Sequence, residues 1–417
     1  MTSLTEAPPT PSASASPLRL IGAVCAAHFV SHYYIIILAP LLPFVRADYG
    51  VSYTEIGLAL AAFNVVSTLL QTPAGFLVDR FGARLLLAAG LAIGGIAYVL
   101  AGLVPSFWFM VAMFALSGVG NTVYHPANYA LLSRHVAGPR IGQAFSVHTF
   151  AGMLGSAVAP PTLLLMQSLW GWRGAFIGAG IMGFFVAAAV LMVREPVSRA
   201  MRKGPATPAS ADDGEPAGNS AGWALLLSPP ILLNLVFFIL LAFMNSGINN
   251  YSVAALGLLH GTPVAIANTA LTALLLLTAI GVLAGGLVVT RTALHSTVAA
   301  LGIAGMVVTA GLIAAVDFGT LALIAVMAAF GFCSGVIAPS RDMIVRAATP
   351  EGSFGKVFGF VTTGFNLGGI VAPMVFGALM DAGHPRLLFI GVAVAALVAI
   401  LTVTTLPKRS RQGGVSR

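Results

Sequence analysis

Long stretches of this chain carry no charged residue, and they limit the possible folds more than any other feature. Asp, Glu, Lys and Arg are absent from Leu85 to Ser133, from Ile141 to Trp172 and from Ala221 to Thr290. A membrane-spanning helix needs about 20 apolar residues. The first and last of these runs are therefore expected to hold two spans each, with breaks at Pro105 and around His260–Pro263.

The composition supports a membrane protein. Hydrophobic residues make up 58% of the chain, charged residues only 8%, and the mean hydropathy is +0.96. Ordinary soluble domains carry roughly a quarter charged residues, so the surplus of apolar surface must face lipid. We predict twelve transmembrane helices and no sheet. The expected spans are 18–45, 54–78, 85–104, 106–133, 141–168, 173–193, 224–256, 264–289, 295–316, 319–346, 355–380 and 386–406.

The placement of Lys and Arg predicts the orientation. With the N-terminus inside, sixteen of the 20 basic residues fall on the cytoplasmic side and three, Arg46, Arg173 and Arg386, fall outside. Cytoplasmic loops of membrane proteins carry such an excess. We therefore expect a multi-pass protein of the cell (inner) membrane with both termini in the cytoplasm. The net charge of +8 is then a topology signal, and no nucleic-acid partner is expected.

Composition also divides the chain. Residues 1–17 and 407–417 are expected to form cytoplasmic tails, the first of them disordered, and the Pro-, Ala-, Gly- and Ser-rich segment 195–222 is expected to form a flexible cytoplasmic link. This leaves an N-terminal half at 18–194 and a C-terminal half at 223–406. The two cysteines, Cys25 and Cys333, lie in apolar stretches and are expected to be core residues rather than a disulfide.

An internal repeat relates the two halves. The segment Gly118–Pro126 aligns with Gly331–Pro339 at a spacing of 213 residues. The same spacing pairs Gly142 with Gly355, Phe145 with Phe358, Gly155 with Gly368 and Pro160 with Pro373. Six spans separate the copies, so the six-helix halves share one orientation. Parallel repeats of this kind are related by an axis along the membrane normal and enclose a solute site near the midplane.

A motif between spans 2 and 3 resembles the signature loop of the major facilitator superfamily. It consists of Gly75, Asp79, Arg80, Gly82 and Arg84, and a copy without the acid is present at Gly286–Arg291. The resemblance implies the major facilitator fold, a functional monomer and transport by alternating access. It also implies that these five residues belong to a cytoplasmic gate that is shut while the outer side is open.

A narrower resemblance is to the fosmidomycin-resistance-like branch of this superfamily, which includes drug exporters. It is based on His28–Tyr33, Tyr124–Pro126 and Pro339–Asp342. The chain departs from the pattern of proton–drug antiporters, because Phe114 stands where they usually have an Arg. Their span 5 motif is present only in part, at Gly152–Pro160. Both departures weaken the efflux interpretation.

Polar residues inside spans are costly and usually face a cavity. Helical spacing puts them on shared faces, which in this superfamily line the central path on spans 1, 4, 7 and 10. The candidates for the translocation path are His28, His32, Asn121, His125, Asn128, Asn245, Asn249, Arg341 and Asn366. The repeat spacing pairs His32 with Asn245. The alternative for the amides is a helix–helix contact. For His148, in span 5, the alternative to a functional role is a bond to a neighbouring carbonyl.

Arg341 and Asp342 are adjacent charged residues within span 10, and both are candidates for a functional role. Adjacent side chains on a helix point about 100° apart, so we expect each to find a partner elsewhere. Arg341 can hold an anionic group with its fork of donors. The alternative is that both residues lock helices together near the end of span 10. Asp342, His32 and His125 are the candidates for proton coupling, because they are groups that can titrate in the working range.

The predicted function is therefore a secondary active transporter of a small organic solute, an organic anion or a drug-like compound, coupled to a proton or another ion. The alternatives are an uptake permease for a small carboxylate and, in a different class, a transporter-like membrane sensor. No enzyme activity, cofactor or metal is expected, since the two span 1 histidines have no carboxylate companions at ligand spacing. The expected partners are the substrate, the coupling ion and the lipid bilayer.

Overall fold

The structure is a computed structural model that describes residues 17–136, 141–193, 224–350 and 353–405. The link 195–222, the tail 407–417 and residues 1–16 of the first tail lie outside this range. Across the described residues the chain is helical and has no strand, as predicted. The elements are α1 (Pro17–Ile36), η1 (Ala39–Leu41), α2 (Leu42–Tyr49), α3 (Tyr53–Phe81), α4 (Ala83–Leu103), α5 (Phe107–Asn121), α6 (Tyr124–His135), α7 (Ile141–Met192), α9 (Pro229–His260), α10 (Val264–Arg291), α11 (His295–Ala315), α12 (Thr320–Ala348), α13 (Phe354–Asp381) and α14 (Arg386–Thr404).

The predicted number of spans is confirmed. Within the described residues, 11 helical segments are long and apolar enough to cross a membrane. One of them lies within α7, whose 52 residues contain a non-helical Gly171 with φ 72° and ψ 170°. A side chain would disfavour that backbone conformation, so glycine permits a sharp turn between two crossings. Counting α7 twice gives twelve spans. The expected breaks are found at Val104–Ser106 and Gly261–Pro263.

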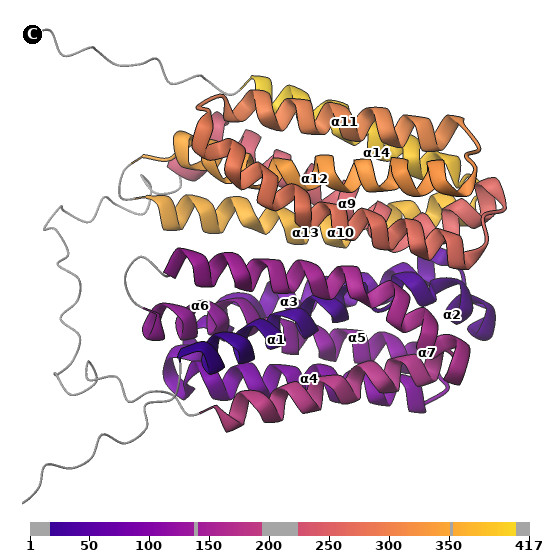
Figure 1. Cartoon of the computed structure of the whole chain (residues 1–417), viewed down its shortest axis with the longest axis horizontal. Coiled ribbons are helices and arrows are strands. Elements are labelled where there is room, and N and C mark those ends of the chain that lie inside the picture. Colours follow the sequence, from indigo (N-terminus) through magenta and orange to yellow (C-terminus); the bar gives the residue numbers. More distant parts are fainter. Residues whose placement is uncertain (1–16, 137–140, 194–223, 351–352, 406–417) are drawn as a thin grey trace, which may run out of the picture.

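Two bundles lie side by side (Figure 1). The N-terminal half, coloured indigo to magenta, forms one bundle, and the C-terminal half, orange to yellow, forms the other. The start of α1 and the ends of α7 and α14 lie at the same end of the molecule. We call this end the terminal face. The other end, where α2 lies, is the opposite face.

Span 4 is divided into α5 and α6 just before Pro126, whereas the equivalent Pro339 lies inside the continuous α12. Pro126 has no backbone N–H, so the carbonyl of Thr122 loses its partner four residues on. On its other side, the N–H of Thr122 donates to the carbonyl of Val119, three residues back, at 3.3 Å. The break reorients the second segment, which carries His125 and Asn128.

Glycines at equivalent positions pack the two halves in the same way. A Cβ on Gly118 would meet the carbonyl of Phe63 at 2.6 Å, and one on Gly331 would meet the carbonyl of Leu274. Likewise Gly155 packs on the carbonyl of Phe29, and Gly368 packs on that of Ile239. These close approaches confirm the parallel repeat.

The same contacts correct the register of the first helices. Phe29 and Ile239 are 210 residues apart, and the left-handed C-cap glycines Gly50 and Gly261 are 211 apart. The spacing of 213 therefore holds for spans 4–5 and 10–11 but not for spans 1 and 7. The pairing of His32 with Asn245 was wrong, because the connections between the early spans differ in length.

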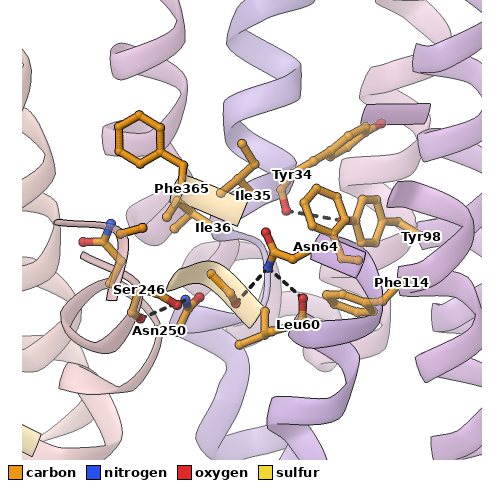
Figure 2. A pocket seen from close by; sticks show the side chains of 14 residues that line it. Tyr34, Ile35, Ile36, Leu60, Asn64, Tyr98, Phe114, Ser246, Asn250 and Phe365 are labelled. Atoms are coloured by element: carbon orange, nitrogen blue, oxygen red, sulfur yellow. Dashed lines mark hydrogen bonds between the residues drawn. The ribbon is translucent and has the colours of Figure 1, made fainter. Parts of the chain in front are cut away.

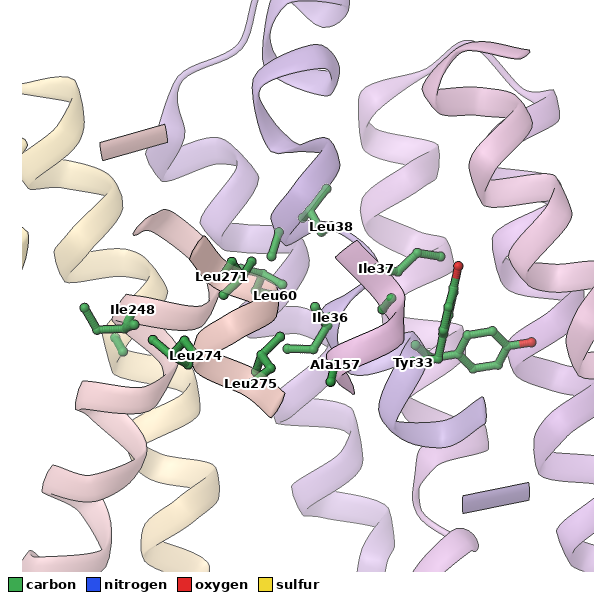
Figure 3. Close-up of a cluster of buried hydrophobic side chains, with 14 of the residues drawn as sticks. Tyr33, Ile36, Ile37, Leu38, Leu60, Ala157, Ile248, Leu271, Leu274 and Leu275 are labelled. Carbon is green, nitrogen blue, oxygen red and sulfur yellow. The ribbon is translucent and has the colours of Figure 1, made fainter. Parts of the chain in front are cut away.

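The halves close against each other toward the opposite face. Figure 3 shows Ile36 and Leu60 of the N-terminal half beside Leu271 and Leu275 of α10, all buried. The Tyr251 hydroxyl donates to the carbonyls of Tyr53 at 3.4 Å and Pro373 at 2.9 Å, which links α9 with α3 and α13. An apolar seal of this kind excludes water from that side of the interface.

Candidate translocation site

A cavity of about 180 Å³ lies between the two halves and includes the seal residues Ile36 and Leu60 in its wall (Figure 2). Aromatic rings form much of its wall, and amides and a serine supply its polar groups. The lining residues are Tyr34, Ile35, Ile36, Leu60, Phe63, Asn64, Tyr98 and Phe114 of the N-terminal half, with Ala242, Ser246, Asn249, Asn250, Phe365 and Gly369 of the C-terminal half. Of the predicted path residues, Asn249 lines this cavity.

Two further amides in the cavity wall were missed from the sequence. The Asn64 Nδ2 donates to the carbonyl of Leu60 at 2.8 Å and to that of Gly369 at 3.2 Å, so it bridges the halves. The Asn250 Nδ2 donates to the carbonyl of Ser246 at 2.9 Å. Both are amides within membrane-spanning helices, which is the signal that could have identified them.

Arg341 does not line this cavity but contacts Phe365, which does. Its guanidinium carbon is 4.8 Å from the ring centroid of Phe238 and 4.9 Å from that of Phe365. Those two rings are themselves in contact, with centroids 4.8 Å apart. Cation–π contacts occupy the faces of a guanidinium, so the N–H groups along its edge stay available to donate hydrogen bonds.

That edge binds Asp342, which contradicts the prediction that the two neighbours do not pair. The Arg341 Nε donates to Oδ1 of Asp342 at 2.8 Å, and Nη2 lies 2.8 Å from the same oxygen. The angular separation of adjacent residues did not prevent pairing, because the arginine side chain is long enough to curl back once the two rings fix its plane. Asp342 keeps 46% of its side chain exposed, so this carboxylate is not enclosed by the protein.

Four histidines of the N-terminal half come together, and we call them the histidine cluster: His28, His32, His125 and His148. Measured from the His28 ring, the centroids lie 4.5 Å away for His32, 5.5 Å for His125 and 3.9 Å for His148. The sequence singled out the first three as path residues but not the fourth. Among the described residues, no three His, Cys, Asp or Glu side chains are placed to hold a metal ion.

The remaining predicted amides make contacts between helices. The Asn121 Nδ2 donates to Ser67 Oγ at 3.3 Å, and Asn245 Oδ1 accepts from Ser334 Oγ at 3.1 Å. Asn128 is fully buried. The Asn366 Nδ2 lies 3.5 Å from Gln71 Oε1 of the other half. In this conformation these contacts favour the helix-contact alternative for Asn121 and Asn245, while Asn366 lies at the interface of the halves.

The comparison with known families decides the class of protein. The sequence profile of the Major Facilitator Superfamily matches residues 24–259 and 235–416. The chain belongs to this superfamily. It is accordingly a transporter rather than an enzyme, as the sequence motif predicted.

Relatives within the superfamily carry small organic solutes or confer drug resistance. The probable L-galactonate transporter of Escherichia coli is 32% identical over 34% of this chain and 32% of its own length. The fosmidomycin resistance protein of the same species is 25% identical over 42% of this chain and 41% of its own length. These alignments span well under half of each relative. The MFS-type transporter YfnC of Bacillus subtilis is 24% identical over 94% of this chain and 93% of its own length.

Solved structures share the fold. A variant of the nucleoside transporter NupG superposes with a TM-score of 0.75 at 14% identity, covering 93% of this chain and 100% of that one. A bacterial homologue of the human lysosomal transporter Spinster, in an inward-facing and unoccupied conformation, gives a TM-score of 0.74 at 15% identity over 94% and 97% of the two chains. At this identity the likeness concerns the fold of the superfamily alone.

The superfamily signature loop lies at the terminal face. Asp79 is 3.6 Å from Arg134 Nη2, and Arg84 Nη1 donates to the carbonyl of Val193 at 2.6 Å. Gly82 has a φ of 92°, which lets the chain turn from α3 into α4. The guanidinium of Arg80 lies over the Phe81 ring at 5.3 Å. These contacts stay within the N-terminal half, whereas Gly75 has open space around its Cα.

Proposed function

We propose that this superfamily member moves a small organic anion across the membrane by alternating access, coupled to a proton. The observation that carries the proposal is the position of Arg341. Its guanidinium contacts Phe365, a residue of the cavity wall between the halves, and its ion pair among the described residues is with the partly exposed Asp342. A bound carboxylate or similar anion can take the place of Asp342 on that edge with the same fork geometry.

Named relatives favour an anion. L-galactonate, D-galactonate and sulfoacetate, in the names of three similar transporters, are all acids that ionise at neutral pH. The alternative of drug export is supported by the resistance proteins among the relatives and by the aromatic cavity wall. An aromatic wall suits a bulky apolar compound, whereas Arg341 suits a compact anion.

In the proposed orientation the protein lies in the cell (inner) membrane, and its terminal face points to the cytoplasm. Basic residues concentrate in the segments at that face, which is the arrangement of cytoplasmic loops. With the opposite face sealed, this conformation is then open inward. The signature loop residues Gly75, Asp79, Arg80, Gly82 and Arg84 act as a gate that engages across the halves in the other conformation. We propose that the protein works as a monomer.

Uptake by proteoliposomes tests the proposal. Labelled L-galactonate, sulfoacetate and a panel of cationic drugs are offered with and without an imposed pH gradient. Accumulation of an organic acid that responds to the gradient is the expected result. Movement of cationic drugs alone contradicts the anion assignment and makes drug export the primary function, while movement without a response to the gradient contradicts proton coupling.

A further inference from the structure

We propose that His28, His32, His125 and His148 together take up one proton beyond those of their neutral imidazoles, and that this is the proton coupled to transport. The inference rests on the proposed function and adds His28 and His148 to the coupling machinery. It identifies the coupling site as a shared cluster in the N-terminal half, separate from the anion site at Arg341 in the C-terminal half. A proton enters this cluster from water on one side of the membrane and leaves to water on the other.

The spacing of the rings limits the cluster to one charge. Three neighbours surround His28 within 5.5 Å, and the nearest, His148, is stacked on it at 3.9 Å. Two imidazolium ions at such separations, in a region of low dielectric, repel each other strongly. Groups coupled this tightly take up protons as a unit rather than one by one.

Unpartnered nitrogen atoms indicate that the cluster binds something. His148 is 1% exposed, yet neither ring nitrogen has a hydrogen-bond partner within the described residues. The Nδ1 of His28, which is 4% exposed, is in the same situation. Buried polar groups are almost always paired, so orphaned ones call for an explanation. A shared proton, with the water that delivers it, supplies one.

Packing alone does not require histidine here, as the other half shows. Gly152 packs on His28. The counterpart of Gly152 at a spacing of 213 is Phe365, whose ring contacts that of Phe238 in a tilted arrangement. By the same spacing, the counterparts of His125 and His148 are Ala338 and Val361. Apolar side chains therefore fill the equivalent places in the C-terminal half, and the four histidines are special to the N-terminal half.

The cluster has an entrance and a route to the anion site. His125 is exposed, whereas His28 and His148 are buried beneath it. The groups that face the cluster are His28 and His32 from α1, His125 and Tyr129 from α6 and His148 from α7. Tyr129 stacks near His125 at 6.2 Å, lies 6.1 Å from His148, and is within electrostatic range of Asp342 on α12.

A positive cluster consequently attracts the Asp342 carboxylate and weakens its hold on Arg341. The arginine edge that Asp342 releases becomes available to a substrate anion. Loss of the proton reverses both effects, so proton and anion bind together and leave together. Reciprocal linkage between the two sites follows from thermodynamics.

Two transport modes of the full chain in proteoliposomes test the cluster, with labelled L-galactonate and sulfoacetate as probes. Accumulation driven by a pH gradient needs net movement of the proton with the anion, whereas counterflow of preloaded probe at equal pH needs exchange of the anion without net proton movement. For His148→Gln we expect loss of driven accumulation with counterflow retained. The control His384→Gln, an exposed residue after α13, is expected to keep both. Driven accumulation retained by His148→Gln overturns the proposal and leaves the proposed function standing.

A second variant and a substrate-free measurement cover the other outcomes. If His148→Gln also loses counterflow because it misfolds, His125→Gln at the exposed edge decides in its place by the same criteria. Ring-nitrogen NMR of the histidine-labelled chain needs no probe molecule. We expect the four cluster imidazoles to titrate as one event that His148→Gln alters. Four independent titrations contradict the single shared proton. This result tests the cluster even if the wild-type protein shows no gradient-driven accumulation, an outcome that contradicts the proposed coupling itself.

Discussion

The carboxylate of Asp381, the last residue of α13, caps the first turn of α3 at Thr54 in the other half. Its Oδ2 accepts from the Thr54 backbone N–H at 2.8 Å and from Thr54 Oγ1 at 2.6 Å, and its Oδ1 accepts from the Tyr53 N–H at 2.7 Å. A carboxylate at a helix N-terminus satisfies orphan N–H groups and complements the helix dipole. In this structure, with the opposite face closed, the cap joins α13 of one half to α3 of the other.

Replacing this cap is expected to shift the carrier toward the conformation that opens at the opposite face. Loss of a capping side chain costs about 1 kcal/mol, so Asp381→Ala changes the ratio of the two conformations by about fivefold. The measurement is labelling of a single cysteine at Leu60, buried between the halves, by a thiol reagent that cannot cross the membrane, after Cys25 and Cys333 are replaced by Ser. Asp317→Ala is the matched control, since Asp317 contacts His260 of its own half. Equal labelling of both variants contradicts the idea that this cap stabilises the closed opposite face.

Arg341→Ala is expected to abolish transport of organic acids while the protein still inserts and folds. A charge-assisted hydrogen bond contributes about 1.5–3 kcal/mol, so affinity for the anion falls by at least about tenfold. Arg341→Lys keeps the charge but loses the fork and the flat stacking, and an intermediate loss is expected. Binding to purified protein is measured beside uptake, with Arg346→Ala, exposed on the same helix, as the control. Undiminished transport by Arg341→Ala assigns Arg341 to a structural role.

Asp79→Asn is expected to slow turnover more than it weakens substrate binding. In this conformation the Asp79 side chain is 77% exposed, and its contact with Arg134 is long. The substitution therefore removes little here, and its main effect falls on the other conformation, in which the gate engages. Uptake rate and binding affinity, compared side by side, check the split. A variant with wild-type turnover removes Asp79 from the gate.

Gly331→Ala is expected to destabilise the fold, because the new Cβ would collide with the carbonyl of Leu274 on α10. Overpacking of this kind costs about 1–3 kcal/mol. Gly311→Ala provides the contrast, since Gly311 lies inside α11 and a Cβ at this position would meet no neighbouring side chain or helix within 4 Å. There alanine is neutral or stabilising by up to about 1 kcal/mol. Thermal unfolding in detergent distinguishes the two. Similar melting temperatures for both variants argue against the close helix contact.

The site was only partly predictable, as two residues show. His28 and His32 were expected on one face of span 1 because their spacing of four fixes it, and their rings do meet at 4.5 Å. His148 lies 116 residues beyond His32, and for it the sequence left a bond to a neighbouring carbonyl as the alternative to a functional role. Its place in the cluster depends on Gly152, which lets α7 approach α1 closely. Such an approach is a property of two helices together.

The sequence by itself determined the class of fold, the number of spans and the family of this protein. These conclusions came from patterns that can be read along the chain: the charge-free runs, the repeat that pairs Gly118 with Gly331, and the loop around Asp79. Each pattern reflects the free-energy cost of placing a charge or a side chain at a given position. The tertiary structure alone decided which side chains meet: the pairing of Arg341 with Asp342, and the cap of Asp381 on α3. Those contacts depend on rings and helix ends brought together from distant segments, and no local spacing encodes that geometry.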